Sequence, residues 1–386
     1  MGNRCPVCER EHETMICLDC GFDHSLHFES HPTLAPVPAD RKALAALRTA
    51  WDLRNRFGTL RISNGIYTGE ISNHQPHGRG TMSYDNGNIY EGQWIDGSQN
   101  GQGKLTMPNG NVYDGQFQDN QRTGYGVYTW ASGARYSGYF HNGSRSGQGT
   151  MTYDNGNVYA GQWLDDERSG QGKLTWFNGD VYEGQWRNDT RNGQGDLRWA
   201  SGACYTGLWQ NGKRSGQGRM VYADGSDYTG QWVNDKRNGQ GKVIWKDGAV
   251  YEGQWCNDNR TGRGKLTWAS GNVYEGQWAD NQCTGQGKLT WANGDRYQGN
   301  FEKGSRTGQG KMFWANGNVY EGQWKNNMRN GQGKLTWPNG DVYEGTFVSD
   351  SNHTLIGGTG TFHEGRKTYT AEWKNGKLHK LRRKFF

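Results

Sequence analysis

Apolar and polar residues alternate along short segments that follow one another through most of the chain. In residues 320–342, YEGQWKNNMRNGQGKLTWPNGDV, the alternation occurs at 320–324 and again at 333–337. A period of two is typical of β-strands, so each copy of this unit predicts a β-hairpin. One face of the predicted sheet carries aromatic, aliphatic and glycine residues, and the other face is polar and charged.

The hairpin unit has a constant length. A tyrosine returns every 23 residues, at Tyr67, Tyr90, Tyr113, Tyr136, Tyr159, Tyr182, Tyr205, Tyr228, Tyr251, Tyr274, Tyr297, Tyr320 and Tyr343. A fixed period between about 20 and 50 residues is the sequence signature of a stacked array. We therefore expect an all-β protein, an elongated single-layer antiparallel β-solenoid of 13–14 stacked hairpins. Residues that recur in every copy serve stacking first, so a distinct activity would reside where the repeat is broken.

Glycine explains how an aromatic ring can fit into every copy. Four glycines of the unit recur through the array: Gly322, Gly331, Gly333 and Gly340. A missing side chain lets a neighbouring ring lie flat on the backbone. Gly340 suits a tight turn that needs a positive φ. On the polar face we expect cross-strand pairs such as Glu321 with Lys334.

The pattern YEGQW followed by GxGxLTWxNG resembles the MORN (membrane occupation and recognition nexus) repeat, over roughly residues 60–378. The resemblance implies a long, twisted, single-layer sheet of stacked MORN hairpins that serves as a scaffold or docking surface. It does not imply catalysis.

Composition excludes several classes of protein. Aromatic residues make up 13% of the chain and hydrophobic residues only 32%, which predicts stacked rings instead of a thick aliphatic core. The GxGxL segments precede strands and lack the Lys-Ser/Thr of a phosphate-binding loop. No serine, histidine and acid arrangement stands outside the repeat, so we expect no enzyme. Without an apolar span or leader in the sequence, we expect a cytoplasmic protein, with a location peripheral to a membrane as the alternative.

Four cysteines near the N-terminus form two CxxC pairs: Cys5, Cys8, Cys17 and Cys20. Two such knuckles can supply four thiolates to one tetrahedral Zn²⁺. The segments RCPVC and CLDCGF look like a zinc ribbon, so residues 1–36 predict a zinc-ribbon-like segment with a structural Zn²⁺. Disulfides and a redox CxxC are the alternatives, although an odd total of seven cysteines is typical of a reduced protein. A histidine could also replace one cysteine ligand.

Residues 37–59 predict one capping α-helix between the ribbon and the array. Asp40 can cap residues 41–57, whose apolar side chains share one side, and Gly58 fits the end of the helix. An open sheet end invites association. The helix would therefore pack on the first hairpin and shield it, with a partner-binding helix as the alternative.

The period fails at the other end, where Tyr369 follows Tyr343 by 26 residues instead of 23. We expect the array to span 60–376, with a partial fourteenth hairpin. Residues 377–386 then predict a basic C-terminal tail that carries Lys377, Lys380, Arg382, Arg383 and Lys384. Each basic residue near an anionic membrane contributes about 1 kcal/mol to binding, so this tail is the candidate for membrane or phosphoinositide contact.

An arginine also recurs in most copies: Arg122, Arg145, Arg168, Arg191, Arg214, Arg237, Arg260, Arg306 and Arg329. We expect this row to line one edge of the array, in the hairpin loops, where it is solvated and hydrogen-bonded to carbonyls. A contribution to anion binding is the alternative. The array is nearly neutral, and the ribbon has balanced charge, which disfavours nucleic-acid binding.

These observations favour a non-enzymatic scaffold for protein–protein interaction. Aromatic rings at regular spacing would dock an extended or helical segment of a partner. The candidate contact residues are the tryptophans of the first strand, represented by Trp186, Trp209, Trp232, Trp255, Trp278 and Trp324. Peripheral binding to anionic membranes is the alternative function. A homodimer is a further expectation, because the sheet ends are open.

Overall fold

The computed structural model describes residues 3–4, 11–12, 57–350 and 354–384. All regular elements in these residues are β-strands. Two short strands, β1 (Asn3–Arg4) and β2 (Glu11–His12), pair antiparallel. The predicted zinc ligands and residues 41–56 of the predicted helix lie outside the described residues. Within the described part of the chain, no helix could cross a membrane.

The chain divides into two compact units, which meet in the sequence between Asp154 and Asn155. The first unit contains β3 (Phe57–Ile62), β4 (Gly65–Ser72), β5 (Gln75–Tyr84), β6 (Ile89–Ile95), β7 (Ser98–Thr106), β8 (Val112–Gln118), β9 (Gln121–Thr129), β10 (Arg135–His141) and β11 (Ser144–Thr152). Within this unit each strand pairs antiparallel with the next strand in the chain.

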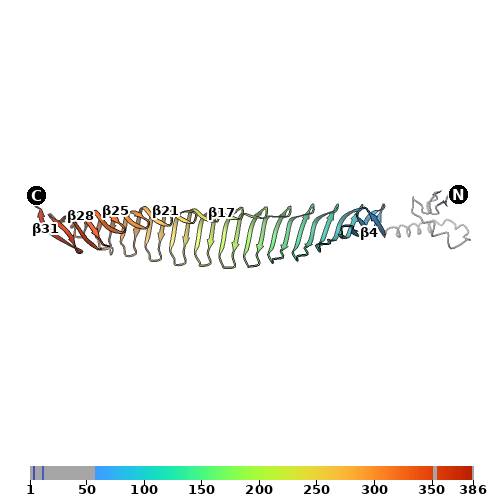
Figure 1. Ribbon diagram of the computed structural model, residues 1–386, viewed down its shortest axis with the longest axis horizontal. Helices are drawn as coiled ribbons and strands as arrows, with labels where there is room; N and C mark the ends of the chain where they lie inside the picture. The colour runs from blue at the N-terminus through green and yellow to red at the C-terminus, as the bar shows by residue number, and fades with distance from the viewer. Residues whose placement is uncertain (1–2, 5–10, 13–56, 351–353, 385–386) are drawn as a thin grey trace. The chain divides into compact units, whose positions relative to one another are not determined.

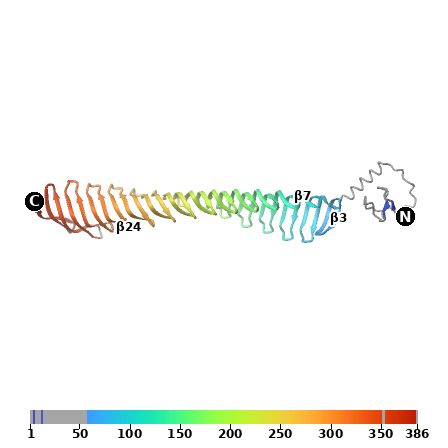
Figure 2. The same ribbon diagram turned by 90° about the horizontal axis from the view of Figure 1, so that it is seen from above.

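The second unit has the same organisation. It contains β12 (Val158–Leu164), β13 (Glu167–Thr175), β14 (Val181–Arg187), β15 (Thr190–Arg198), β16 (Cys204–Gln210), β17 (Lys213–Val221), β18 (Asp227–Val233), β19 (Lys236–Ile244), β20 (Val250–Cys256), β21 (Asn259–Thr267), β22 (Val273–Ala279), β23 (Gln282–Thr290), β24 (Arg296–Glu302), β25 (Ser305–Phe313), β26 (Val319–Lys325), β27 (Met328–Thr336), β28 (Val342–Ser349), β29 (Leu355–Glu364), β30 (Lys367–Lys374) and β31 (Lys377–Lys384). Figures 1 and 2 show its strands following one another in chain order. The predicted succession of antiparallel hairpins is confirmed.

The two faces of the sheet differ as predicted. Tyr320 is fully buried, and Trp324 and Leu335 are 5% and 4% exposed. Glu321 and Gln323, which point to the other face, are exposed. The register places Tyr320 opposite Leu335, so aromatic and aliphatic side chains of neighbouring strands pack on one face.

Glycine makes room for the tyrosine rings. A Cβ atom on Gly333 would lie 2.5 Å from the hydroxyl oxygen of Tyr320. That hydroxyl donates a hydrogen bond of 2.9 Å to the carbonyl of Gln323. The ring therefore lies flat across the glycine of the next strand, and its polar atom is satisfied by the backbone.

The buried rings of the second unit form one continuous column. Trp324 meets Tyr297 and Tyr320 edge to face, with ring centres 5.2 Å and 5.3 Å apart. The same contact recurs from Trp163 to Phe347. Edge-to-face aromatic pairs are favourable beyond the area that they bury. This column is the core of the unit.

A bulge bends most hairpins at the same place. The register between β26 and β27 shifts between Gly322 and Trp324. Gly331 has a φ of 100°, which other residues rarely adopt. The amide of Gln332 donates to Oε1 of Gln323 at 2.8 Å, so the side chain satisfies a backbone group that the bulge frees.

The bend curls the sheet across its width. Arg329 lies at the start of β27, and Trp314 follows the end of β25, which runs in the same direction. Strands of nine residues in a flat sheet would hold these positions roughly 25 Å apart. The guanidinium carbon of Arg329 nevertheless lies 5.5 Å from the ring centre of Trp314. The aromatic face is therefore concave, and its two long edges approach each other.

The structure corrects three expectations. Phe57 and Gly58 belong to β3, not to the end of a helix. Residues 377–384 are not a tail: they form β31, which pairs with β30 because its backbone continues the ladder. Glu321 lies opposite Lys334 as predicted, but Lys334 forms its ion pair with Glu344 of the following hairpin, at 2.7 Å.

Candidate functional site

The tryptophans of the first strand line the inside of the curled sheet. The six predicted contact residues are between 2% and 6% exposed: Trp186, Trp209, Trp232, Trp255, Trp278 and Trp324. Their indole nitrogens donate to backbone, as Trp186 does to the carbonyl of Gly172 at 3.1 Å. Partner contact through these rings stays a prediction. Their burial leaves a partner little ring surface to contact.

The recurring arginines cover these rings. The guanidinium carbon lies 4.3 Å from the ring centre in Arg168 and Trp186, and 4.1 Å in Arg191 and Trp209. The same arrangement recurs in later copies, to Arg306 over Trp324 at 4.5 Å. A guanidinium over an indole face is attracted by the ring quadrupole. These arginines are half-buried over the rings and do not line a solvated edge, which corrects the predicted placement.

Each of these arginines also binds the next hairpin turn. In Arg306 the amide and Nε donate to Oδ1 of Asn327 at 2.8 Å and 3.3 Å, and Nη2 donates to its carbonyl at 2.9 Å. Asn326 and Asn327 have φ values of 49° and 66°, as a two-residue hairpin turn of type I′ requires. The predicted hydrogen bonds from the arginine row to loop carbonyls are confirmed.

A second aromatic row lies at the other edge of the concave face. It follows the second strand of each hairpin and is half-buried: Trp176, Trp199, Tyr222, Trp245, Trp268, Trp291, Trp314 and Trp337. The guanidinium carbons of Arg260, Arg306 and Arg329 lie 6.0 Å, 5.4 Å and 5.5 Å from the ring centres of Trp245, Trp291 and Trp314. We call this row, with Arg168, Arg191, Arg214, Arg237, Arg260, Arg306 and Arg329, the arginine–tryptophan seam.

Charge along the seam is unevenly compensated. Arg168, Arg214 and Arg237 form ion pairs with aspartates of the next turn, at 2.8 Å, 3.0 Å and 2.9 Å. Among the described residues, no carboxylate forms an ion pair with the remaining seam arginines, Arg191, Arg260, Arg306 and Arg329. Burial lowers the pKa of these four guanidinium groups from its ordinary value. A half-buried cation without a counter-ion attracts an acidic ligand.

One copy of the seam lacks its arginine. Cys283 stands at this position, opposite Trp278 in the register. The next ring inside the sheet is Phe301 instead of tryptophan, and it is 4% exposed. Burial raises the pKa of the Cys283 thiol to about 11, so this cysteine stays neutral. In this copy the cation is absent and the next ring is smaller, although Phe347 follows the copy that contains Arg329.

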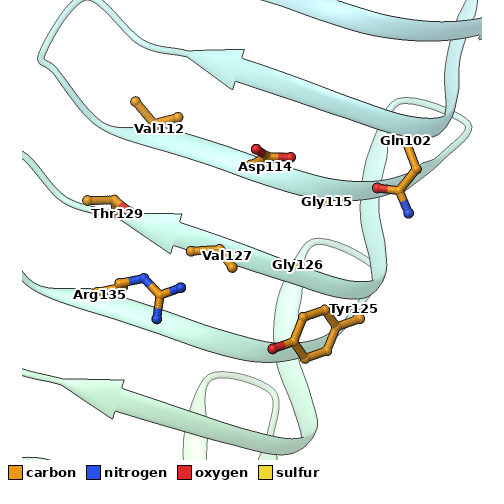
Figure 3. Close-up of a pocket in the computed structure, with 9 residues that line it drawn as sticks. All are labelled: Gln102, Val112, Asp114, Gly115, Tyr125, Gly126, Val127, Thr129 and Arg135. Atoms are coloured by element: carbon orange, nitrogen blue, oxygen red, sulfur yellow. The ribbon is translucent and has the colours of Figure 1, made fainter.

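The polar face carries a different break, in the first unit. Tyr125 and Tyr139 replace the glutamine found in most copies, and Val127 replaces the lysine. The two tyrosines are each 51% exposed, and their rings meet edge to face at 5.7 Å. The hydroxyls of Tyr125 and Ser137 are 2.7 Å apart. Figure 3 shows these strands and the shallow hollow of about 530 Å³ that Tyr125 and Val127 help to line.

The predicted membrane-binding residues lie on β31, an edge strand. Lys380 pairs with Glu364 at 2.8 Å and lies 5.0 Å from the ring centre of Phe362. Nζ of Lys384 donates to the hydroxyl of Thr361 at 3.4 Å. Lys377, Arg382 and Arg383 are exposed on the same strand. Lysine and arginine on an edge strand oppose its pairing with another chain.

The predicted zinc ligands, Cys5, Cys8, Cys17 and Cys20, are not among the described residues, so the metal site stays a prediction. In the described ranges, no group of three or more His, Cys, Asp or Glu side chains could hold a metal ion. The two strands β1 and β2 flank the first CxxC pair in the sequence.

The sequence did not reveal which tryptophans are accessible. Both rows fall on the same predicted face, because alternation alone cannot distinguish a ring inside the curl from a ring at its edge. The curl depends on the bulge at each hairpin. One signal in the sequence could have identified the buried row: most of its tryptophans are preceded by an arginine of the repeat before, as Trp324 is by Arg306.

Two solved structures resemble the chain weakly. The TCP10 domain of Danio rerio CPAP in complex with a STIL peptide is 10% identical, with a TM-score of 0.31, and the match covers 66% of this chain and 96% of that one. The TCP domain of Drosophila melanogaster SAS-4 with a proline-rich motif of Ana2 is 14% identical, with a TM-score of 0.26, covering 45% and 86%. Likenesses at this level support no conclusion about fold or function. No curated protein matches the chain significantly.

The family comparison is decisive. MORN repeats match residues 67–89, 90–112, 113–135, 136–158, 159–181, 182–204, 205–227, 228–250, 251–273, 274–296, 297–319, 320–342 and 369–379. These segments make up more than half of the 386 residues. The first twelve begin at tyrosines of the 23-residue period, and the gap after residue 342 coincides with the break in that period. The chain belongs to the MORN repeat family.

Proposed function

We propose that this chain is a non-enzymatic scaffold that binds a partner protein along the arginine–tryptophan seam of its second unit. The observation that carries the proposal is the repetition of one half-buried aromatic ring and one half-buried cation in nearly every copy. Tryptophan, tyrosine and arginine are the residues most enriched at the energetically important positions of protein interfaces.

The seam suits an elongated segment better than a compact ligand. Its rings recur along successive hairpins and do not converge on a single cavity. The hollow on the polar face that Figure 3 shows is shallow and open. A partner that makes small contacts in many copies gains affinity from their sum, and loses only part of it when one copy is changed.

Affinity purification with the full chain tests the proposal. The bait is compared with a seam variant, Trp245→Ala with Trp291→Ala, and with a matched control, Phe177→Ala. Phe177 is a turn aromatic that is 82% exposed and outside the seam. We expect the parental chain and the control to retain the same proteins and the seam variant to lose them. Retention of the same proteins by a folded seam variant would contradict the proposal.

The predicted zinc ribbon would act as a second contact module. Deleting residues 1–56, which leaves β3 complete, tests this part separately. Partners that depend on the ribbon would be lost from the shortened chain and kept by the seam variant. If the shortened chain retains the same partners, residues 1–56 are not required and binding is a property of the array.

Peripheral binding to anionic membranes is the alternative function, and the exposed basic residues of β31 favour it. Lys377, Arg382 and Lys384 can be changed to serine without removing the strand. If membrane binding depends on them, sedimentation with vesicles rich in anionic lipid decreases in this variant and at high salt. Equal sedimentation of the variant would exclude β31 as the membrane contact.

A further inference from the structure

We propose that the segment bound by the seam is an acidic, proline-rich stretch in the polyproline II conformation. The inference rests on the function proposed above and names the chemistry of its partner. Two properties of the seam carry it: the distance at which its rings repeat, and the uncompensated arginines beside them.

The repeat distance of the seam matches polyproline II. Each copy adds two strands, which are about 4.8 Å apart, so the half-buried rings recur about every 9.6 Å. Polyproline II has three residues per turn and a rise of about 3.1 Å, which gives about 9.3 Å per turn. One residue in three would therefore face one ring in every copy. The peptide and the row of rings would differ in length by only about 1 Å over the four steps between five rings.

Other regular conformations fit less well. An α-helix returns a side chain to the same face after seven residues, or about 10.5 Å, so its contacts would drift by about 0.9 Å in each copy. An extended strand spans the distance in about three residues, but its side chains alternate between faces and would meet only every second ring. Of these three conformations, only polyproline II places an equivalent residue of the ligand beside every ring.

The chemistry of the rings suits proline. Aromatic grooves are the usual recognition surface for polyproline II segments, since the ring of proline packs flat on an indole. The residues that follow Trp268, Trp291 and Trp314 are alanines at exposed turn positions. These side chains are small, so they add little bulk beside the half-buried indoles.

The positive charge of the seam arginines determines which residues lie between the prolines of the ligand. Arg260, Arg306 and Arg329 have no acidic partner among the described residues, and their guanidinium groups lie 5.4–6.0 Å from seam rings. In polyproline II, a second line of side chains runs parallel to the prolines at the same spacing. Acidic residues on that line would meet these arginines. Cys283 interrupts the cations, so the copy that contains it needs no acid.

Titration of the purified full chain with synthetic peptides tests the proposal. The ligand is five Pro-Pro-Glu triplets, which match the five rings from Trp245 to Trp337. Binding is measured by calorimetry and by tryptophan fluorescence. We expect affinity to fall about tenfold when lysine replaces glutamate, and when the five glutamates are moved to one end of the peptide. An acidic helical peptide with leucine every seven residues should bind more weakly than the triplet peptide.

Seam variants complete the test. Trp291→Leu with Trp314→Leu should weaken triplet-peptide binding about tenfold, whereas Phe177→Leu should leave it unchanged. Circular dichroism and melting temperature confirm that both variants are folded. Equal binding of the lysine or end-block peptide, or tighter binding of the helical peptide, overturns the inference. If the triplet peptide does not bind but cellular partners still depend on the seam, the scaffold function is kept and the polyproline II ligand is rejected. If neither the peptide nor the cellular partners depend on the seam, both proposals are rejected.

Discussion

The guanidinium carbon of Arg306 lies 4.5 Å from the centre of the Trp324 ring, one hairpin further along the chain. The same side chain donates to the turn that follows that tryptophan, through Nη2 and the carbonyl of Asn327. One arginine thus fastens both the core ring and the turn of the next repeat. Neighbouring repeats are coupled by these contacts as well as by the strand ladder.

Replacing Arg306 should destabilise the second unit. Arg306→Met keeps the apolar stem but removes the cation–ring contact and the two side-chain hydrogen bonds to Asn327, so we expect the free energy of unfolding to fall by about 2 kcal/mol. Arg306→Lys should recover only part of this loss, because an ammonium lacks the planar fork of donors. Urea unfolding followed by tryptophan fluorescence measures both. Lys325→Met, at an exposed site, is the control, and equal stability of the methionine variants would refute the role of the cation.

Glycine at the ring contact should be far less replaceable than glycine in the turn. In Gly333→Ala the new methyl would lie 2.5 Å from the Tyr320 hydroxyl, so the ring must move, and we expect a loss of about 3 kcal/mol. Gly340→Ala meets no atom within 4 Å, and its φ of 86° costs about 1 kcal/mol. Thermal and urea unfolding compare the pair. Similar losses in both would show that ring packing does not require the bare backbone.

The interrupted copy offers a test of coupling between cation and ring. Arg191 donates to the carbonyl of Gly212 at 2.8 Å, and Cys283 lies in the equivalent relation to Gly304. Cys283→Arg and Phe301→Trp should therefore rebuild the seam. We expect the double variant to be more stable than the sum of the single changes by about 1 kcal/mol.

Unfolding free energies of the four chains give this interaction energy. Simple additivity would mean that the tryptophan and its arginine contribute independently. Stabilisation by Cys283→Arg alone, with no further gain from the larger ring, would assign the effect to the turn carbonyl.

Burial should make the array sensitive to alkali. It raises the pKa of Tyr205, Tyr251 and Tyr297 to about 12, whereas a tyrosine in an unfolded chain ionises near pH 10. The folded state holds these protons longer, so stability is complete below about pH 10 and is lost as the pH rises towards 12. Absorbance of tyrosinate and circular dichroism should change together in this range. Ionisation of all tyrosines near pH 10 with the circular dichroism unchanged would contradict the burial of the rings.

The predicted zinc site can be tested by metal content. We expect about one zinc per chain, lost in Cys5→Ser with Cys17→Ser, because each change removes a ligand from a tetrahedral site. Cys256→Ser, at an exposed cysteine of the array, is the control. The array should keep its melting temperature in both variants. Unchanged zinc in the double variant would disprove the assignment.

Local pattern was sufficient to predict the hairpins and their faces. The alternation around Tyr320 fixed which residues share a side, and the recurrence of Gly333 explained how the ring is accommodated. The curl was not predictable, because it arises from Gly331 and the bulge, whose geometry alternation does not encode. For that reason the sequence did not distinguish Trp324, which is buried inside the curl, from Trp314, which is half-buried at its edge.

The ends of the array were harder to predict for a different reason. The basic composition of residues 377–384 suggested a solvated tail, but strand pairing depends on backbone groups, which any of these residues provides. The basic side chains of β31 are compatible with its pairing to β30, and on its other edge they discourage pairing with another chain. The predicted helix was extended to Phe57 by its apolar residues, although Phe57 begins β3.

The hydrogen bonds from the seam arginines Arg168, Arg191, Arg214, Arg237, Arg260 and Arg306 to backbone carbonyls all run from one repeat to the turn of the next. Truncation after a repeat would leave its arginine without the turn carbonyl and the covered indole of the next repeat. Truncation before a repeat would remove only the arginine that covers the indole of its first strand. During synthesis, the arginine of the newest repeat can donate its hydrogen bond to the turn carbonyl only after the next repeat has been made. Shortened chains should therefore tolerate loss of their first repeats better than loss of their last.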